Sequence, residues 1–142
     1  MTTSGTTSVG RELIAAFGDG DWERLRSVVA DGMVYEETGT GRRLEGAAAY
    51  LALCHGWKEV FPDLTGRVER ELSGDGWTAL EVMWTGTQRG AMEGPLGTLP
   101  ATGRYGETRA TLWMRTEDGR VAEIHHHIDL MGLLRNLGAV PA

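Results

Sequence analysis

Residues 125–129, of sequence HHHID, form the densest group of chemically active side chains in the chain. They end a run that reads as a β-strand, in which successive side chains point to opposite faces. His125, His127 and Asp129 should therefore share one face, and His126 should point to the other. A carboxylate between imidazoles can serve as a general acid or base, and the imidazoles can orient it or stabilise an oxyanion. We interpret Asp129, His127 and His125 as candidate catalytic residues.

The same residues have other interpretations. A His-x-His pair on a strand, with an aspartate close by, can bind a transition metal through His125, His127 and Asp129. No further ligand pair is evident in the sequence, so we expect no metal site. Asp129 can instead cap a helix that starts at Leu130, and it can combine this role with catalysis. His126, on the opposite face, is interpreted as a structural or interface residue.

Tyr35 and Glu37 are candidates for substrate binding because they alternate on one face of the first predicted strand. They could project together into a cavity, or they could equally decorate a solvated edge strand. His55 is a further candidate on a predicted long helix, where a single histidine is more often a core or rim residue. Cys54 has no activating partner apart from His55 and is interpreted as a small buried hydrophobe.

Methionine and tryptophan side chains are the candidates for the walls of an apolar cavity, with core packing as the alternative explanation. The candidate lining residues are Met83, Trp84, Met92, Leu96 and Met114. The sequence contains no glycine-rich dinucleotide motif, no P-loop, no Gly-x-Ser-x-Gly and no His-Glu-x-x-His. Nucleotide, phosphate and serine-hydrolase chemistry therefore lack their usual signals.

The elements that must position these side chains divide the chain into a helical first part and a β-rich second part. Hydrophobic periodicity and capping residues predict helices over residues 8–17, 22–30, 45–60 and 130–137. Alternation and turn residues predict strands over residues 33–37, 64–72, 77–88, 105–115 and 120–128. The loop over 90–103 is long enough to suggest a lid or a binding role. Helices followed by a meander of strands indicate the α+β class.

Length and composition limit the class of protein. The 142 residues suit a single domain over 1–142, with residues 1–7 and 139–142 as flexible ends. The net charge of −6 is a poor match for nucleic acid or for an anionic membrane. A single cysteine excludes an internal disulfide framework. Neither a signal peptide nor a membrane span is recognisable, so we expect a cytoplasmic protein. Many of the 21 glycines fall at turns or around the loop over 90–103.

Five short motifs occur in an order that resembles a known family. They are FPDL at 61–64, WTGTQRG at 84–90, PATGR at 100–104, DGRVAE at 118–123 and DLMGLLRNLG at 129–138. Together they make the chain, from about residue 9 to residue 138, resemble the SnoaL-like polyketide cyclases of the nuclear transport factor 2-like superfamily.

The resemblance implies a cone-shaped α+β barrel, in which a strongly curved, mainly antiparallel sheet wraps around the N-terminal helices and encloses a deep pocket. It also implies a homodimer. Cyclases of this family close the last ring of aromatic polyketides by intramolecular aldol condensation, without metal or cofactor. An aspartate in the last strand region serves there as acid and base, and Asp129 is the matching position. The family often has histidine where this chain has Gln88.

We therefore expect a cyclase of polyketide biosynthesis that binds a hydrophobic, aromatic polyketide-like molecule, with no cofactor and no nucleic-acid or membrane partner. Asp129 would remove an α-proton, and His127 or His125 would hydrogen-bond the carbonyl that receives the new bond. The superfamily hosts several activities on one scaffold. An epoxide hydrolase or spiro- or ether-forming cyclase remains an alternative, with Glu37, Tyr35 or His127 as the second acid. A non-catalytic module that binds a hydrophobic ligand is another.

Overall fold

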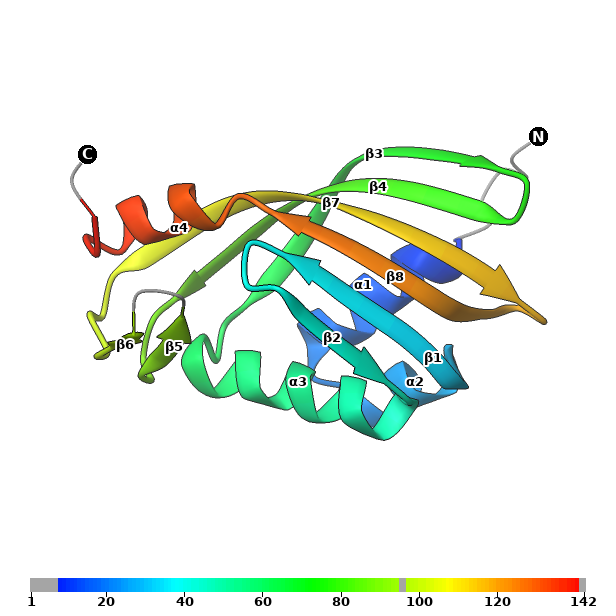
Figure 1. Ribbon diagram of the computed structural model, residues 1–142, viewed down its shortest axis with the longest axis horizontal. Coiled ribbons are helices and arrows are strands. Elements are labelled where there is room, and N and C mark those ends of the chain that lie inside the picture. Colours follow the sequence, from blue (N-terminus) through cyan, green and yellow to red (C-terminus); the bar gives the residue numbers. More distant parts are fainter. Residues whose placement is uncertain (1–7, 95–96, 141–142) are drawn as a thin grey trace.

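The computed structural model describes residues 8–94 and 97–140, which form one large sheet packed against helices (Figure 1). The helices are α1 (Val9–Asp19), α2 (Trp22–Ser27), α3 (Ala47–Val60) and α4 (Leu130–Asn136). The strands are β1 (Val29–Thr38), β2 (Arg42–Glu45), β3 (Thr65–Gly74), β4 (Trp77–Thr87), β5 (Met92–Gly94), β6 (Gly97–Leu99), β7 (Tyr105–Glu117) and β8 (Arg120–Ile128). The large sheet has the order β2-β1-β8-β7-β4-β3, and β5 pairs with β6 in a separate hairpin.

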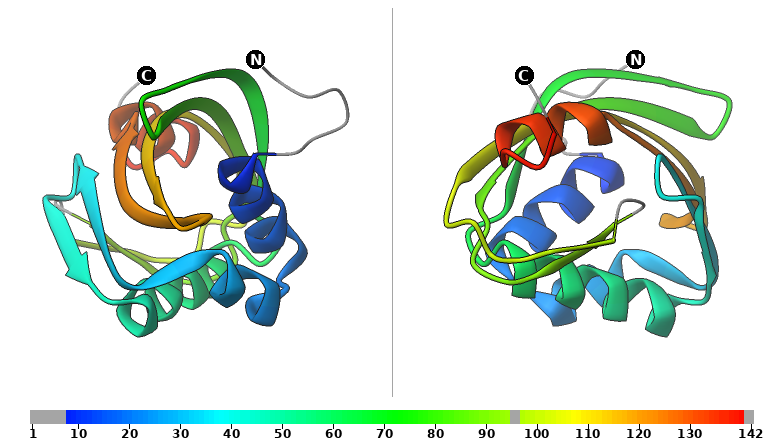
Figure 2. Two further views of the ribbon diagram at one scale, coloured as in Figure 1. Left: turned by 90° about the vertical axis from the view of Figure 1, so that its right-hand side faces the viewer. Right: turned by 60° about the vertical axis from the view of Figure 1, so that its left-hand side comes forward.

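The large sheet is mainly antiparallel and strongly curved. β1 and β8 run parallel, whereas the other neighbouring strands of this sheet run antiparallel. Figure 2 shows the strands curling around α1 and α3. The sheet stays open, because β2 and β3 are its two edges. The predicted α+β class, with a curved, mainly antiparallel sheet wrapped around N-terminal helices, is confirmed.

Side-chain caps define the first two helices. Ser8 caps α1 and Asp21 caps α2, and each side chain accepts a hydrogen bond of 3.1 Å from the backbone N–H three residues further on. The predicted end of the first helix at Phe17 is too early. The helix continues through Gly18 and ends where Gly20 adopts a left-handed conformation with φ 66°.

The β1–β2 hairpin differs most from the prediction. The second helix is shorter than predicted and β1 begins earlier, because Val29 pairs with Val121 of β8. The sequence does not predict β2, whose Leu44 pairs with Tyr35 of β1. As a consequence, α3 begins at Ala47 rather than at residue 45. The start of β1 depends on pairing with the distant strand β8, and β2 depends on pairing with β1, and local periodicity reports neither interaction.

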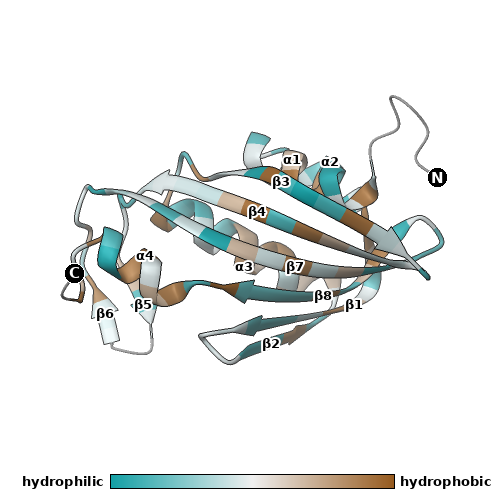
Figure 3. Cartoon of the chain, turned by 90° about the horizontal axis from the view of Figure 1, so that it is seen from above, coloured by the Kyte–Doolittle hydropathy of each residue, from teal (hydrophilic) through white to brown (hydrophobic). Residues whose placement is uncertain are grey.

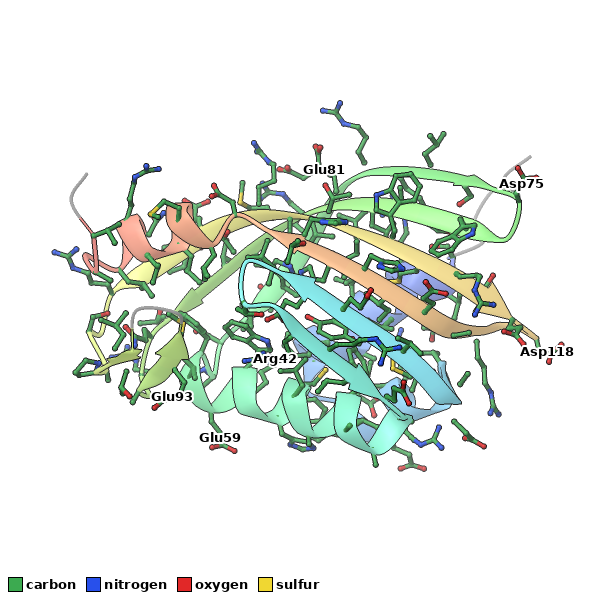
Figure 4. All side chains as sticks on the ribbon, in the orientation of Figure 1. Arg42, Glu59, Asp75, Glu81, Glu93 and Asp118 are labelled. Carbon is green, nitrogen blue, oxygen red and sulfur yellow. The ribbon has the colours of Figure 1, made fainter. Side chains whose placement is uncertain are left out.

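The two predicted long hairpins, β3–β4 and β7–β8, are confirmed. Their tips are Asp75-Gly76, with φ of 53° and 80°, and Asp118-Gly119, with φ of 52° and 76°. Two successive positive φ angles are typical of the type I′ turn, whose twist matches that of the flanking strands. Figure 4 shows Asp75 and Asp118 at the same end of the sheet, opposite to α4.

The segment predicted as a loop over 90–103 contains the β5–β6 hairpin and is held by Gln88, whose side chain is fully buried. The amide nitrogen of Gln88 donates to the carbonyl oxygens of Leu99 at 3.3 Å and Pro100 at 3.2 Å. Its Oε1 accepts a hydrogen bond of 2.7 Å from the hydroxyl of Thr102. The amide nitrogen also donates to the carbonyl oxygen of Gly90 at 3.1 Å, so Gln88 anchors both sides of this segment to the end of β4.

The hydrophobic core lies between the inner face of the sheet and α1, α2 and α3. Its fully buried members include Leu13, Leu25, Met33, Leu80, Leu112 and Ile124. Figure 3 shows hydrophilic and hydrophobic residues mixed along the strands, as expected for a sheet with one buried and one solvated face. Ala139 and Val140, predicted to be flexible, pack against this core. The rest of the predicted flexible ends, 1–7 and 141–142, lies outside the described residues.

Candidate active site

A cavity lies between the inner face of the sheet and the helices α1, α3 and α4. It holds about 710 Å³ of empty space with its open mouth included. Most of the lining side chains are apolar. They include Leu13, Ile14, Phe17, Leu53, Trp57, Phe61, Leu112, Ile128 and Leu133. An apolar cavity of this kind suits a small molecule with a hydrophobic surface.

His126 brings polar chemistry into this cavity. It lies on the inner face of β8 and is 8% exposed, and both of its ring nitrogens have partners within the protein. The indole Nε1–H of Trp84 donates to His126 Nε2 over 3.2 Å. The hydroxyl oxygen of Tyr35 lies 2.8 Å from His126 Nδ1. Three side chains from β1, β4 and β8 therefore meet at one point of the cavity wall.

The chain of hydrogen bonds continues from Tyr35 to Glu37, and its polarity follows from the donors. The hydroxyl of Tyr35 donates to Oε2 of Glu37, which is buried directly behind it. Because His126 Nε2 accepts from the Trp84 indole, the proton of the neutral imidazole must be on Nδ1, which then donates to Tyr35. We call Glu37, Tyr35, His126 and Trp84 the polar chain.

Burial determines the protonation states along the polar chain. Loss of solvation lowers the pKa of His126 to about 3, so its imidazole is neutral at ordinary pH. Burial, reinforced by the nearby Glu37 carboxylate, raises the pKa of Tyr35 well above its usual value, so its hydroxyl keeps its proton.

Glu37 has compensating partners on the β1–β2 hairpin. Its Oε1 accepts a hydrogen bond of 2.6 Å from the hydroxyl of Thr40. The same oxygen forms an ion pair of 3.2 Å with Arg42, whose side chain is one-third exposed. A buried carboxylate requires such partners because leaving water is costly for a charge. The β2 strand, which carries Arg42, is therefore part of the site.

The comparisons with known proteins agree with this fold. Residues 7–137 match the sequence profile of the SnoaL-like polyketide cyclases. The chain belongs to this family. The family resemblance predicted from the sequence motifs is thereby confirmed. None of the curated proteins matches the sequence of this SnoaL-like chain.

Several solved structures resemble this SnoaL-like protein closely. IdmH from Streptomyces antibioticus, a proposed polyketide cyclase, is 27% identical with a TM-score of 0.79, over 92% of this chain and 96% of IdmH. AclR from Streptomyces galilaeus, a proposed hydroxylase, is 24% identical with a TM-score of 0.79, over 94% of this chain and 81% of AclR. TsrD from Streptomyces laurentii is 23% identical with a TM-score of 0.80, over 93% of each chain. At these identities, AclR and TsrD show the fold alone.

In this SnoaL-like chain, the predicted catalytic face of β8 points away from the cavity. His125 and His127 do share one face of β8, as the alternation predicts, but that face is the outer one, and Asp129 beyond the strand is exposed as well. His125 Nε2 contacts Glu123 at 2.5 Å, and His127 Nδ1 lies 2.7 Å from the hydroxyl of Thr38. These candidate catalytic side chains therefore lie outside the cavity, because the helices cover the opposite face of the sheet.

Asp129 lies just beyond β8 and has the capping role that the sequence left open. Its exposed carboxylate accepts a hydrogen bond of 2.9 Å from the backbone N–H of Gly132 and caps α4. Its backbone carbonyl accepts a hydrogen bond of 2.7 Å from the hydroxyl of Thr108, which lines the cavity. Asp129 therefore holds α4 against the cavity, while its carboxylate points away from it.

The candidate substrate-binding residues separate into two groups. Tyr35 and Trp84 line the cavity, and Glu37 lies behind Tyr35. Four other predicted binding residues do not line the cavity. Met83 lies on the opposite face of β4 from Trp84. Met92 and Met114 are buried in the core outside the cavity. His55 is exposed, and the centroid of its ring lies 3.9 Å from that of Trp22. Leu96 lies outside the described residues.

The sequence interpretation places His126 on the correct face of β8 but does not include it among the candidate site residues. The alternation puts His126 on the same face as Ile124 and Ile128, yet the sequence interpretation assigns it only a structural or interface role. Two apolar neighbours on one face are the signal that this face is buried. Cys54, in contrast, is the buried hydrophobe that was predicted, and burial raises the pKa of its thiol to about 12.

Metal-binding clusters and membrane-spanning helices are both absent from residues 8–94 and 97–140. These ranges hold no group of three or more His, Cys, Asp or Glu side chains arranged to bind a metal ion. No helix in this part of the chain has the length and apolar character needed to cross a membrane.

Proposed function

We propose that this chain is a polyketide cyclase that closes a ring in an uncharged aromatic substrate by an intramolecular aldol reaction. Membership of the SnoaL-like polyketide cyclase family supports a cyclase-type role. The cavity supports the substrate class, because Phe17, Trp57 and Phe61 offer flat apolar surfaces. The candidate lining residues Met83, Met92 and Met114 have no part in this proposal.

The observation that carries the proposal is the pairing of Trp84 with His126. A hydrogen-bond donor, Trp84 Nε1–H, and an acceptor, His126 Nε2, lie 3.2 Å apart on the cavity wall. A carbonyl group with an acidic α-carbon presents the complementary pair, an acceptor oxygen beside a C–H group. A substrate that separates the two side chains would therefore receive a donor on its oxygen and a base at its α-carbon.

The reaction that follows balances without any added reagent. His126 Nε2 takes the α-proton, and the Trp84 N–H stabilises the enolate oxygen. The enolate carbon attacks a second carbonyl carbon of the same molecule and forms the new C–C bond. The resulting alkoxide takes back one proton, so no electrons are gained or lost. The apolar walls contribute by holding the two reacting carbons close together.

Incubation with an aromatic β-keto ester of a polyketide type, followed by mass spectrometry and NMR of the products, tests this proposal. The expected product has the mass of the substrate, or that mass minus one water, and contains a new ring. Replacement of His126 by Gln should reduce ring closure by about 10²–10⁴-fold, the contribution of a positioned acid or base. The exposed His55, replaced by Gln, is the matched control. A ring-closure rate in H126Q equal to that of the unaltered protein would refute the assignment.

A second candidate is a non-catalytic module that binds a hydrophobic ligand. The outward position of His125, His127 and Asp129 favours it, because the residues predicted to carry the reaction lie off the cavity. In the same experiment, this function predicts saturable binding with the ligand recovered unchanged. A separate incubation with an epoxide substrate tests the third alternative. Formation of the hydrated product, a diol, would indicate an epoxide hydrolase.

A further inference from the structure

We propose that His126, Tyr35 and Glu37 form a proton relay, in which His126 takes a proton from the bound ligand and Glu37 stores it. The inference rests on the proposed function for the identity of the proton, an α-proton of an uncharged carbonyl compound. It gives Tyr35 and Glu37 a role in proton transfer. This role follows neither from family membership nor from the candidate catalytic residues Asp129, His127 and His125.

A base at the position of His126 needs such a relay. The imidazole is buried in the cavity wall, where the hydrogen-bond partners of its ring nitrogens are Tyr35 and Trp84, and burial holds its pKa near 3. A lone His126 would become a buried cation after taking a proton, which this environment strongly disfavours. A proton that enters at Nε2 must therefore be accompanied by one that leaves at Nδ1.

The geometry supplies this exit. His126 Nδ1 lies 2.8 Å from the hydroxyl oxygen of Tyr35, and that hydroxyl donates to Glu37 Oε2. As the α-C–H bond breaks and Nε2–H forms, the Nδ1 proton passes to Tyr35 and the Tyr35 proton passes to Glu37. The imidazole and the phenol are both neutral before and after the step. One carboxylate becomes a carboxylic acid, and one ligand becomes an enolate.

Conservation of charge in the interior favours this route. The negative charge moves from Glu37 to the enolate, so the number of buried charges does not change. Arg42, which pairs with Glu37 at 3.2 Å, is one-third exposed and can be solvated when the carboxylate is protonated. Thr40, which donates to Glu37 Oε1, keeps the carboxyl group oriented in both states. Protonation of the alkoxide by the reverse sequence restores the starting chain.

Proton exchange tests the relay separately from ring closure. The probe is 2-tetralone, an uncharged bicyclic aromatic ketone, and the readout is deuterium incorporation at its α-carbons in D₂O by NMR. The unaltered protein should exchange the probe faster than buffer does. E37Q, which cannot take a proton, and Y35F, which interrupts the relay, should each slow the protein-dependent exchange by about a hundredfold. Their dissociation constants for the probe, measured by calorimetry, should change by less than about threefold.

Matched controls share the substitution but not the position. Glu36 adjoins Glu37 on β1 but lies on the outer face, where its carboxylate is 3.6 Å from His125 Nδ1, so E36Q should exchange at the rate of the unaltered protein. Tyr105 is 57% exposed on β7, so Y105F is the control for Y35F. Thermal unfolding of all four variants checks that each one is folded.

The pH profile of exchange in the unaltered protein tests the relay without any substitution. Of the titratable groups near His126, Tyr35 contacts it directly and Glu37 lies behind Tyr35 on β1, Tyr50 and Cys54 on α3 line the same cavity, and His127 adjoins it on β8. The relay predicts a rate that is constant between pH 5.5 and 8, after subtraction of the buffer reaction. A rate that falls with protonation of a group near pH 6.5 would overturn the relay, because it would show a solvated imidazole acting alone.

The failure of the relay and that of the proposed function give different results. Exchange that depends on Glu37, without ring closure of any polyketide-type substrate, supports the relay and refutes the cyclase. Ring closure that proceeds in E37Q and Y35F at the rate of the unaltered protein supports the cyclase and refutes the relay. A bound probe that does not exchange faster than in buffer also refutes the relay.

Discussion

Trp84 Nε1 lies 3.2 Å from Nε2 of His126, although the strands that carry these residues are not neighbours in the sheet. β7 lies between β4 and β8, and the curvature of the sheet brings the two side chains together on its inner face. This contact fixes the tautomer of His126, because Nε2 must accept the indole proton.

Removal of the Trp84 donor should reduce catalysis more than binding. W84F keeps an aromatic ring in the cavity wall but loses the N–H that would stabilise the enolate. We expect the rate of ring closure to fall about 10²–10³-fold, as for loss of an oxyanion donor, with a change in ligand affinity below about threefold. Steady-state kinetics and calorimetry provide the two numbers. W113F, at an exposed tryptophan on the outer face of β7, is the control, and equal rates in both variants would argue against the donor role.

Stability should decrease with acidification because of His126. Its pKa is about 3 in the folded chain and near 6.5 in the unfolded chain, so only the unfolded chain gains this proton between those values. The free energy of unfolding should fall as the pH drops below 6.5, with a limiting slope of about 1.4 kcal/mol per pH unit from this residue. Urea unfolding at pH 7, 6 and 5 measures the slope.

Two histidine variants identify the source of this dependence. H126Q should flatten the decrease between pH 7 and 5, whereas H55Q, at an exposed position, should retain it. A decrease of the same size in both variants would assign the effect to other groups.

Gly66 on β3 should be intolerant of substitution because it makes room for Trp84. A Cβ at this position would lie 2.8 Å from Trp84 Cζ3 and 2.9 Å from Val82 Cγ1. G66A should therefore lower the free energy of unfolding by about 1–3 kcal/mol through overpacking. Gly56 on α3 has no neighbour within 4 Å of an added Cβ, so G56A should raise stability by up to about 1 kcal/mol. Urea unfolding compares the two, and equal effects would refute the packing argument.

Asp129 provides a direct test between its two interpretations. If Asp129 acts as the cap of α4, D129A should lower the free energy of unfolding by about 1 kcal/mol. D129N should change it very little, because asparagine caps helices equally well. Thermal and urea unfolding measure this difference. The sequence-based expectation is that D129N abolishes turnover. Retained turnover in D129N agrees with the outward carboxylate, and complete loss with an intact fold would restore the catalytic interpretation.

The larger elements could be predicted because their signals are local. Ser8 and Asp21 cap the helices that follow them, and Asp75-Gly76 and Asp118-Gly119 have the residue types that a type I′ turn needs. Short elements that depend on a partner could not be predicted. β2 has four residues, and its pairing of Leu44 with Tyr35 is the interaction that makes it a strand.

The sequence by itself determined which side chains share a face. Period-two alternation is a property of the extended backbone, so it placed Tyr35 with Glu37 and separated His126 from His125 and His127 without knowledge of the fold. Ile124 and Ile128 indicate that the His126 face of the last strand is buried, but only the tertiary structure decided that this face borders a cavity and which side chains meet His126 there. This arrangement depends on the direction in which the sheet curves and on the side that α1 and α3 cover, and these come from packing between distant segments. Because the cavity lies on the His126 side of β8, the structure favours His126 over Asp129 as the candidate base.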